Sequence, residues 1–224
     1  NTSSGQIIMG GNDSSGMAVN KMGARPLFLI NALNTGLIET RGLNNYGIAL
    51  DLNNLNSASS ILNKGIINVK GDKSGGIVLK GSIGNTDDNV VNKGNINVTS
   101  STSFGIYSNV SDTKYVNEGN IDLTSAANSI GLRNEGGLLK NGSNGIINLT
   151  NGTNNIGLYS TDGTTENNGK IIISNGTDNI GIYAKGSGTS VVNSGEINAV
   201  SSGKIKGIAV TDNADITNIK DIKL

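Results

Sequence analysis

The sequence predicts an all-β fold, a right-handed parallel β-helix of about eight coils with three short strands in each coil. The first observation is a repeat, whose corner glycines recur every 24–29 residues. The second is an alternation of apolar and polar residues inside each repeat, which is typical of strands. The third is that no single repeat carries enough apolar surface to fold alone, so stacked repeats must share one core.

The repeating unit reads Asn-x-Gly-x-Ile-x-apolar and is followed, 11 or 12 residues after its glycine, by Gly-Ile or Gly-Leu. One copy is Asn63-Lys64-Gly65-Ile66-Ile67-Asn68-Val69, with Gly76-Ile77 after it. Eight units cover the chain, and a ninth begins near Ile219. Residues 1–224 are therefore expected to form one solenoid domain, with both ends cut in mid-coil of a longer protein.

Alternation inside the unit predicts which side chains face the core. Isoleucine stands two residues after the corner glycine, as at Ile67, Ile96, Ile121 and Ile147, and another mostly apolar residue follows two positions later. The residue between them is mostly polar and is expected to face outward. A second inward column is predicted after the second glycine: Ile48, Ile77, Ile106, Leu132, Leu158, Ile182 and Ile208. A third is predicted just before the corner asparagine: Leu33, Leu62, Val91, Val116 and Val192.

Glycine and asparagine mark the corners between strands. Gly65, Gly94 and Gly119 are expected to supply positive φ or close approach of two backbones. Asparagine two residues before a corner glycine is expected to form a ladder of amide hydrogen bonds from coil to coil. Its predicted members are Asn34, Asn63, Asn92, Asn117, Asn167 and Asn193, with Ser143 as the one interruption.

The composition excludes several classes of protein. The chain has 17 basic and 17 acidic residues and no cysteine, histidine or tryptophan. Without imidazole or thiolate, Ser-His, Cys-His and zinc chemistry have no residues to carry them, and we predict no cofactor and no enzymatic activity. A zero net charge argues against nucleic-acid binding. The longest apolar runs, such as Pro26 to Ile30, are too short to span a membrane.

The connections between the second and third strands differ along the chain. They are longer within about residues 17–91, and the coils are more regular over about residues 94–224. Insertions in a solenoid collect on one face, which is often the binding face; the alternative is neutral drift in length on a surface that tolerates it. The apolar segment around Phe28 is expected either to cover the core or to contact another part of the full-length protein.

One row of side chains is a candidate binding surface. One residue beyond each Gly-Ile or Gly-Leu pair stand Tyr107, Arg133, Tyr159 and Tyr183, on four successive coils. Aromatic and arginine side chains suit sugar faces and protein receptors. The alternative is an intramolecular ladder in which the arginine lies on the tyrosine rings.

Acidic side chains form a second candidate site. Asp87, Asp112 and Asp162 stand seven residues before a corner glycine, and the first two lie on adjacent coils. They are close enough in the predicted fold to share a proton or to bind calcium weakly. The alternative is a local hydrogen bond from the turn backbone, since Ser or Thr precedes each aspartate. No basic residue recurs beside the pair, which argues against catalysis.

The Asn-Lys-Gly-x-Ile-Asn-Val phrases at 63–69 and 92–98, with Gly-Ile-Tyr at 105–107 and 181–183, carry a resemblance. The chain resembles the passenger domains of Gram-negative type V autotransporters, and in particular the large fusobacterial outer-membrane adhesins. The resemblance implies display on the cell surface, a C-terminal outer-membrane β-barrel outside these residues, and attachment to a glycan or protein receptor of host cells or other bacteria. Two rivals stay open: a carbohydrate-active β-helix enzyme, and a mechanical spacer that carries a distal binding tip.

Overall fold

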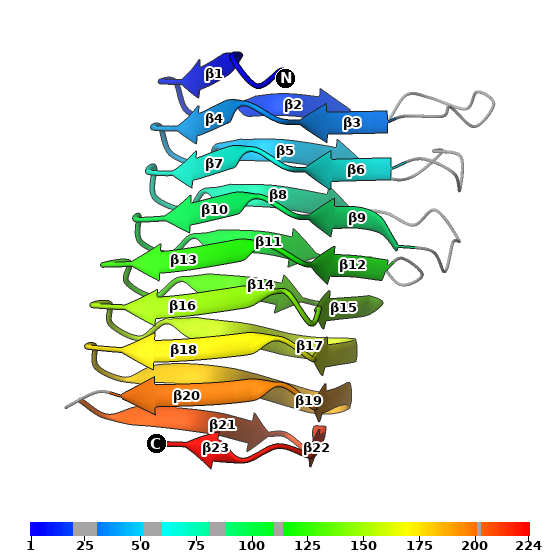
Figure 1. Cartoon of the computed structure of the whole chain (residues 1–224), viewed down its shortest axis with the longest axis vertical. Helices are drawn as coiled ribbons and strands as arrows, with labels where there is room; N and C mark the ends of the chain where they lie inside the picture. Colours follow the sequence, from blue (N-terminus) through cyan, green and yellow to red (C-terminus); the bar gives the residue numbers. More distant parts are fainter. Residues whose placement is uncertain (20–30, 52–59, 81–87, 110–113, 201–202) are drawn as a thin grey trace.

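The computed structural model of the chain is a right-handed parallel β-helix, in which the strands lie across the long axis and the coils stack along it (Figure 1). The structure describes residues 1–19, 31–51, 60–80, 88–109, 114–200 and 203–224. These residues contain no helix, and every strand pairing among them is parallel. The predicted fold class is therefore confirmed.

The first strand of each coil contributes to one flat sheet that runs the length of the molecule. Among the described residues this sheet has nine strands, and its order follows the chain. Corresponding residues of successive repeats lie opposite one another, as in the pairing of Ile67 with Ile96 and of Ile96 with Ile121. The strands are β1 (Gln6–Met9), β4 (Leu37–Thr40), β7 (Ile66–Val69), β10 (Asn95–Val98), β13 (Asn120–Thr124), β16 (Ile146–Thr150), β18 (Lys170–Ser174), β20 (Glu196–Val200) and β23 (Ile222–Lys223).

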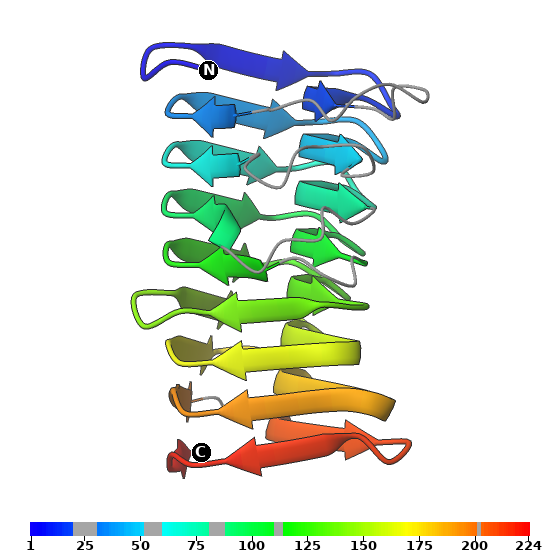
Figure 2. The same cartoon turned by 90° about the vertical axis from the view of Figure 1, so that its right-hand side faces the viewer.

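The second and third strands of each coil form the remaining walls (Figures 1 and 2). The second strands are β2 (Ser15–Val19), β5 (Tyr46–Asp51), β8 (Gly75–Lys80), β11 (Phe104–Ser108), β14 (Ile130–Asn134) and β21 (Ile205–Thr211). The third strands are β3 (Asn31–Asn34), β6 (Ser60–Asn63), β9 (Asp88–Asn92), β12 (Lys114–Asn117), β15 (Leu138–Asn141) and β22 (Asp215–Asn218).

Two coils depart from the expected three separate strands. There the second and third strands join into one long bent strand, β17 (Ile156–Asn167) and β19 (Asn179–Asn193). The register shifts between Thr161 and Gly163, where Asp162 and Gly163 have φ values of 60° and 94°. The connection is short in these coils, so the chain turns the corner by this irregularity without leaving the sheet.

The core is the column of apolar side chains that the alternation predicts. Ile67, Ile96, Ile121 and Ile147 are fully buried, and each contacts the equivalent strand above and below. In the second strands Ile48, Ile77, Ile106, Leu132, Leu158 and Ile182 are buried as expected, and Ile208 is half-buried near the C-terminal end. Burial of such a continuous column is the main source of stability in a stacked-repeat fold.

The prediction for the third strand is wrong by one residue. Leu33, Leu62, Val91, Val116 and Val192 do line up along the stack, but none of them belongs to the apolar core: Leu33 is 46% exposed, Leu62, Val91 and Val192 are half-buried, and only Val116 is buried. The buried side chains are their neighbours Ile61, Val90, Tyr115, Leu139 and Val191. The corner asparagine points inward, so the inward residue before it must stand two positions away, because strand side chains alternate.

A continuous asparagine ladder runs along one edge of the core. Within the described residues eight side-chain hydrogen bonds link nine asparagines, and each Nδ2 donates to the Oδ1 of the next coil. The predicted interruption at Ser143 is wrong, because Asn141 takes the place in the ladder. The members are Asn1, Asn34, Asn63, Asn92, Asn117, Asn141, Asn167, Asn193 and Asn218.

The corner glycines are needed for close approach of two coils. A Cβ atom on Gly94 would lie 2.1 Å from the carbonyl oxygen of Gly65, and one on Gly119 would lie 2.2 Å from that of Gly94. Gly65, Gly94 and Gly119 do not have positive φ. These three glycines therefore serve the close approach of two backbones and not a positive φ.

Candidate functional site

The predicted row of Tyr107, Arg133, Tyr159 and Tyr183 lies on the outer face of the second strands. Parallel pairing sets Tyr107 beside Arg133, Arg133 beside Tyr159, and Tyr159 beside Tyr183. All four side chains are half-buried. The second glycine of the repeat stands two residues before each of them, so the four side chains occupy the same place in successive coils.

Arg133 is stacked between two of these rings. Its guanidinium carbon lies 5.2 Å from the ring centroid of Tyr107 and 6.0 Å from that of Tyr159. The rings of Tyr159 and Tyr183 are 5.5 Å apart and tilted by 60°. The contacts of the predicted intramolecular ladder therefore exist, and each is of the kind that contributes about 0.5–1.5 kcal/mol.

Glu135 fixes the N-terminal end of the row, and the sequence patterns did not indicate it. One carboxylate oxygen accepts a hydrogen bond from the hydroxyl of Tyr107 at 2.7 Å, and the other accepts a hydrogen bond from Nε of Arg133 at 2.8 Å. Burial, together with the hydrogen bond and charge of Glu135, raises the pKa of Tyr107 to about 12. Tyr107 therefore stays a protonated donor at neutral pH.

Two further aromatic side chains extend the row. The ring of Phe104 lies 5.5 Å from that of Tyr107, and the ring of Tyr46 lies 6.1 Å from Phe104 at an interplanar angle of 26°. Phe104 occupies space that a side chain at Gly75 would need, since a Cβ atom there would lie 2.1 Å from Cε2 of the ring. The sequence feature that could have indicated Tyr46 and Phe104 is an aromatic residue directly before the second glycine, which occurs in both repeats. We call Tyr46, Phe104, Tyr107, Arg133, Tyr159 and Tyr183 the aromatic strip.

A hollow of about 380 Å³ opens at the N-terminal end of the aromatic strip. Val78 is buried at its floor, and Lys80 and Asn109 are exposed at its rim. Aromatic rings and polar groups thus meet in one depression, which is the usual composition of a small-molecule site. The full lining is Tyr46, Val78, Lys80, Phe104, Tyr107, Asn109 and Arg133.

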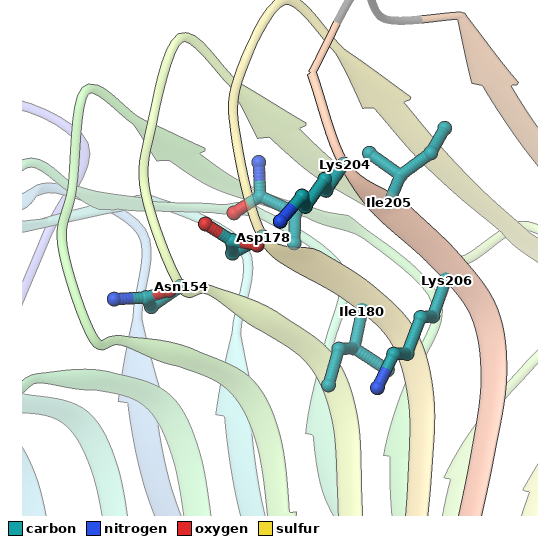
Figure 3. Close-up of a pocket in the computed structure, with 7 residues that line it drawn as sticks. Asn154, Asp178, Ile180, Lys204, Ile205 and Lys206 are labelled. Atoms are coloured by element: carbon teal, nitrogen blue, oxygen red, sulfur yellow. The ribbon is translucent and has the colours of Figure 1, made fainter.

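A second hollow, of about 580 Å³, lies near the C-terminal end (Figure 3). In Figure 3 the side chains of Asp178 and Lys204 extend toward one another, and Asn154 projects from the preceding coil. Asn154 and Asp178 have φ values of 56° and 55°, because they occupy the tight turn that leads into the second strand. The described lining of this hollow is free of aromatic rings and consists of Asn154, Asp178, Asn179, Ile180, Lys204, Ile205 and Lys206.

The other predicted site residues are only partly described. Phe28, Asp87 and Asp112 lie outside the described residues. Asp162 lies in the bend of β17, where its backbone amide donates to the hydroxyl of Thr189 at 2.7 Å. The described residues contain no group of three or more carboxylates that could hold a metal ion. Within the same residues, no helix has the length and apolar character needed to cross a membrane.

The outer face of the first sheet has no aromatic side chain among the described residues and carries a network of polar hydrogen bonds. Asn97 donates to Asn68 at 2.8 Å, and Asn68 donates to the carboxylate of Glu39 at 3.4 Å. Glu39 also pairs with Arg41 at 2.6 Å and with Lys70 at 2.7 Å. These hydrogen bonds, with Lys70 first and Arg41 second, lower the pKa of Glu39 to about 2. The carboxylate is buried beneath its two cations and serves packing between coils.

Comparison with known proteins adds no relative to this description. Neither the protein-family models, nor the curated proteins, nor the solved structures contain a match to the chain.

Proposed function

We propose that this chain is a non-catalytic attachment module, displayed on a bacterial surface as part of an autotransporter passenger. The observation that carries the proposal is the aromatic strip, which spans the six coils from β5 to β19 on one face and has a member on five of them. Its tyrosines and arginine are half-exposed, and these residue types dominate the binding energy of recognition surfaces. The partner is a surface glycan or a protein receptor.

The support beneath the aromatic strip favours this role. Each strip residue stands on a strand that is hydrogen-bonded on both sides, over a fully buried core residue such as Ile106 or Leu132. Binding to side chains that are already held in place loses little conformational entropy. The face of the first sheet offers asparagine amides that already bond to one another, and these have less to gain from a partner.

A spacer role is the second candidate, and the regularity of the C-terminal coils favours it. From β13 to β20 equivalent strands keep one register, and the coils differ mainly in their outward residues. A stack of this kind holds a distal segment at a fixed distance from the cell. In that case the aromatic strip would serve only the stability of the coils.

One triple variant separates the two roles. Replacing Tyr107, Tyr159 and Tyr183 by Ser should weaken attachment of the purified chain to cells about tenfold or more, since three anchors are lost. The melting temperature should fall by a few degrees, because ring contacts of about 1–2 kcal/mol are lost as well. A control triple on the first sheet, Ile66→Ser, Ile146→Ser and Ile172→Ser, removes similar outward apolar surface and should leave attachment unchanged. Unchanged attachment in the tyrosine variant would favour the spacer.

The absence of catalysis is tested separately. The chain should release no reducing ends from pectin, mucin or host glycans above a blank. Release that is abolished by Asp87→Asn or Asp112→Asn would overturn the non-catalytic assignment and favour the enzyme.

A further inference from the structure

The hollow at the end of the aromatic strip exists because two small residues stand on β8. Gly75 lies between Tyr46 and Phe104 in the register of the sheet, and Val78 lies between Ala49 and Tyr107. Phe104 fills the space above Gly75, and the remaining volume of about 380 Å³ lies beside it. This volume falls in the range of about 300–1,000 Å³ found for small-ligand sites.

The walls of the hollow are apolar and partly flat. The rings of Tyr46 and Phe104 are inclined to each other by only 26°, and Tyr107 closes one side at 5.5 Å from Phe104. A hexopyranose carries several C–H groups on one ring face, and these pack against aromatic rings with loss of apolar surface to water. An entirely polar ligand would gain nothing from such walls.

The rim of the hollow offers both donors and acceptors. Asn109 supplies an amide that donates and accepts, while Lys80 and Arg133 donate. A sugar hydroxyl both donates and accepts, so a mixed rim of this kind suits it. The Arg133 charge is already matched by the Glu135 carboxylate, and the Lys80 side chain is exposed to solvent, so the rings face no desolvated, unmatched cation; this favours a neutral ligand over an anionic one.

The hollow shown in Figure 3 is larger but lacks these features. Its apolar surface comes from Ile180 and Ile205, and no ring stands in its wall. The two hollows therefore differ in their aromatic rings, which are the feature that recognises the apolar face of a sugar.

We propose that the hollow lined by Tyr46, Val78, Phe104 and Tyr107 binds one neutral hexopyranose of a glycan. The apolar face of the sugar lies on the rings, and its hydroxyls bond to Lys80, Asn109 and Arg133. This inference rests on the proposed attachment function and names the ligand class for it.

The test uses a panel of immobilised oligosaccharides that end in galactose, glucose, mannose or an N-acetylhexosamine, together with sialylated forms of the same glycans. The chain should bind at least one neutral glycan and should lose affinity for it when the sugar is sialylated. Tyr46→Ser and Tyr107→Ser should each weaken binding about tenfold. Tyr107→Phe keeps the ring and should retain most of the affinity. Ile172→Ser removes an outward apolar side chain from the first sheet, outside the aromatic strip, and should leave binding unchanged.

Asn109→Ala tests the same hollow at an exposed position, without disturbing a packed ring, and should weaken binding several-fold while leaving the melting temperature unchanged. Binding of no neutral glycan, a preference for the sialylated forms, or a loss of binding in Ile172→Ser equal to that in Tyr107→Ser would each overturn the proposal. Attachment to cells without binding to any glycan of the panel would overturn this inference and leave the attachment function standing. Binding to glycans without attachment to cells would overturn the attachment function and leave the glycan site standing.

Discussion

Nδ2 of Asn117 lies 2.9 Å from Oδ1 of Asn141, although Asn141 stands four residues before its corner glycine and Asn117 only two before its own. Two extra residues form a turn at this corner, closed by the bond from the amide of Gly145 to the carbonyl of Gly142 at 2.9 Å. The ladder thus keeps its register across an insertion. Between these coils the loop length changes while the inward amide stays in place, because an unpaired buried amide is costly.

Loss of one ladder member should therefore destabilise the fold strongly. Asn117→Ala removes the bond that Asn92 donates and the bond that Asn141 accepts, and leaves Nδ2 of Asn92 only its longer bond to the carbonyl of Gly94 at 3.3 Å; each buried group that loses a bond costs about 1–3 kcal/mol. Urea unfolding should show a fall of about 2–5 kcal/mol in the free energy of unfolding. Ser143→Ala, at an exposed position outside the ladder, is the matched control and should change stability by less than about 0.5 kcal/mol. Equal effects of the two substitutions would contradict the ladder.

The stacked core predicts a large effect at Ile121. Ile121→Asp places a charge in a fully buried position between Ile96 and Ile147, and should cost several kcal/mol. Ile172→Asp makes the same chemical change on the outer face of β18 and should cost about 1 kcal/mol or less. Thermal melting of both variants measures the difference. Equal melting temperatures of Ile121→Asp and the parent would rule out the stacked column.

Glu39 should make stability depend on pH in acid. Its pKa in the folded chain is about 2, below the ordinary value of 4.5, so its contribution is fully present above about pH 4.5 and is lost as the pH falls through about 2. Because Arg41 and Lys70 are half exposed, we expect about 1–2 kcal/mol and not the full shift. The free-energy difference between the parent and Glu39→Gln should shrink over this window.

Glu196→Gln is the control for the acid experiment. Its carboxylate is more exposed and lies 3.9 Å from Lys170, so the substitution should have little effect at any pH in this range. A difference between the parent and Glu39→Gln that does not change between pH 5 and pH 2 would argue that Glu39 is not held by its two cations.

Tyr107 should ionise well above the ordinary range of a tyrosine. Its pKa is about 12 in place of 10, so its protonated form stabilises the fold fully below about pH 10, and this contribution is lost as the pH rises through about 12. In a titration of tyrosinate absorbance, Tyr107→Phe should remove the component near pH 12. Glu135→Gln should lower that component only in part, because burial is the larger cause. Removal of a component near pH 10 by Tyr107→Phe would contradict the hydrogen bond to Glu135.

The sequence predicted the fold well because period-two alternation is unambiguous where apolar and polar residues alternate strictly. At Ile96-Asn97-Val98 only one assignment of faces is possible, and it is the observed one. At Ile61-Leu62-Asn63 two apolar residues stand together, and the alternation cannot say which one is buried. Asn63 decides which of the two is buried. Its amide points inward to the ladder, so alternation places Ile61 inward and Leu62 outward. The sequence prediction did not use this constraint.

The site was predicted less completely for a geometric reason. Tyr107 was found because it follows the Gly-Ile pair, whereas Tyr46 and Phe104 precede the second glycine by one residue. Alternation would place a residue three positions before Tyr107 on the opposite face. The pairing skips Gly105, so both Phe104 and Tyr107 face outward. Glu135 was missed because an acidic residue stands at the equivalent place in only one other repeat, at Asp51.

All the bonds of the asparagine ladder point the same way along the stack, parallel to the hydrogen bonds between strands. A tensile force applied between the two ends would therefore act along these hydrogen bonds. Every interface between coils would carry the same force, and neighbouring strands would be pulled apart without sliding past one another. Each coil contacts only its neighbours, so the weakest interface should open first and release one coil of 24–29 residues. The molecule would lengthen in steps of roughly 80–100 Å, and each step would limit the force that reaches whatever the aromatic strip holds.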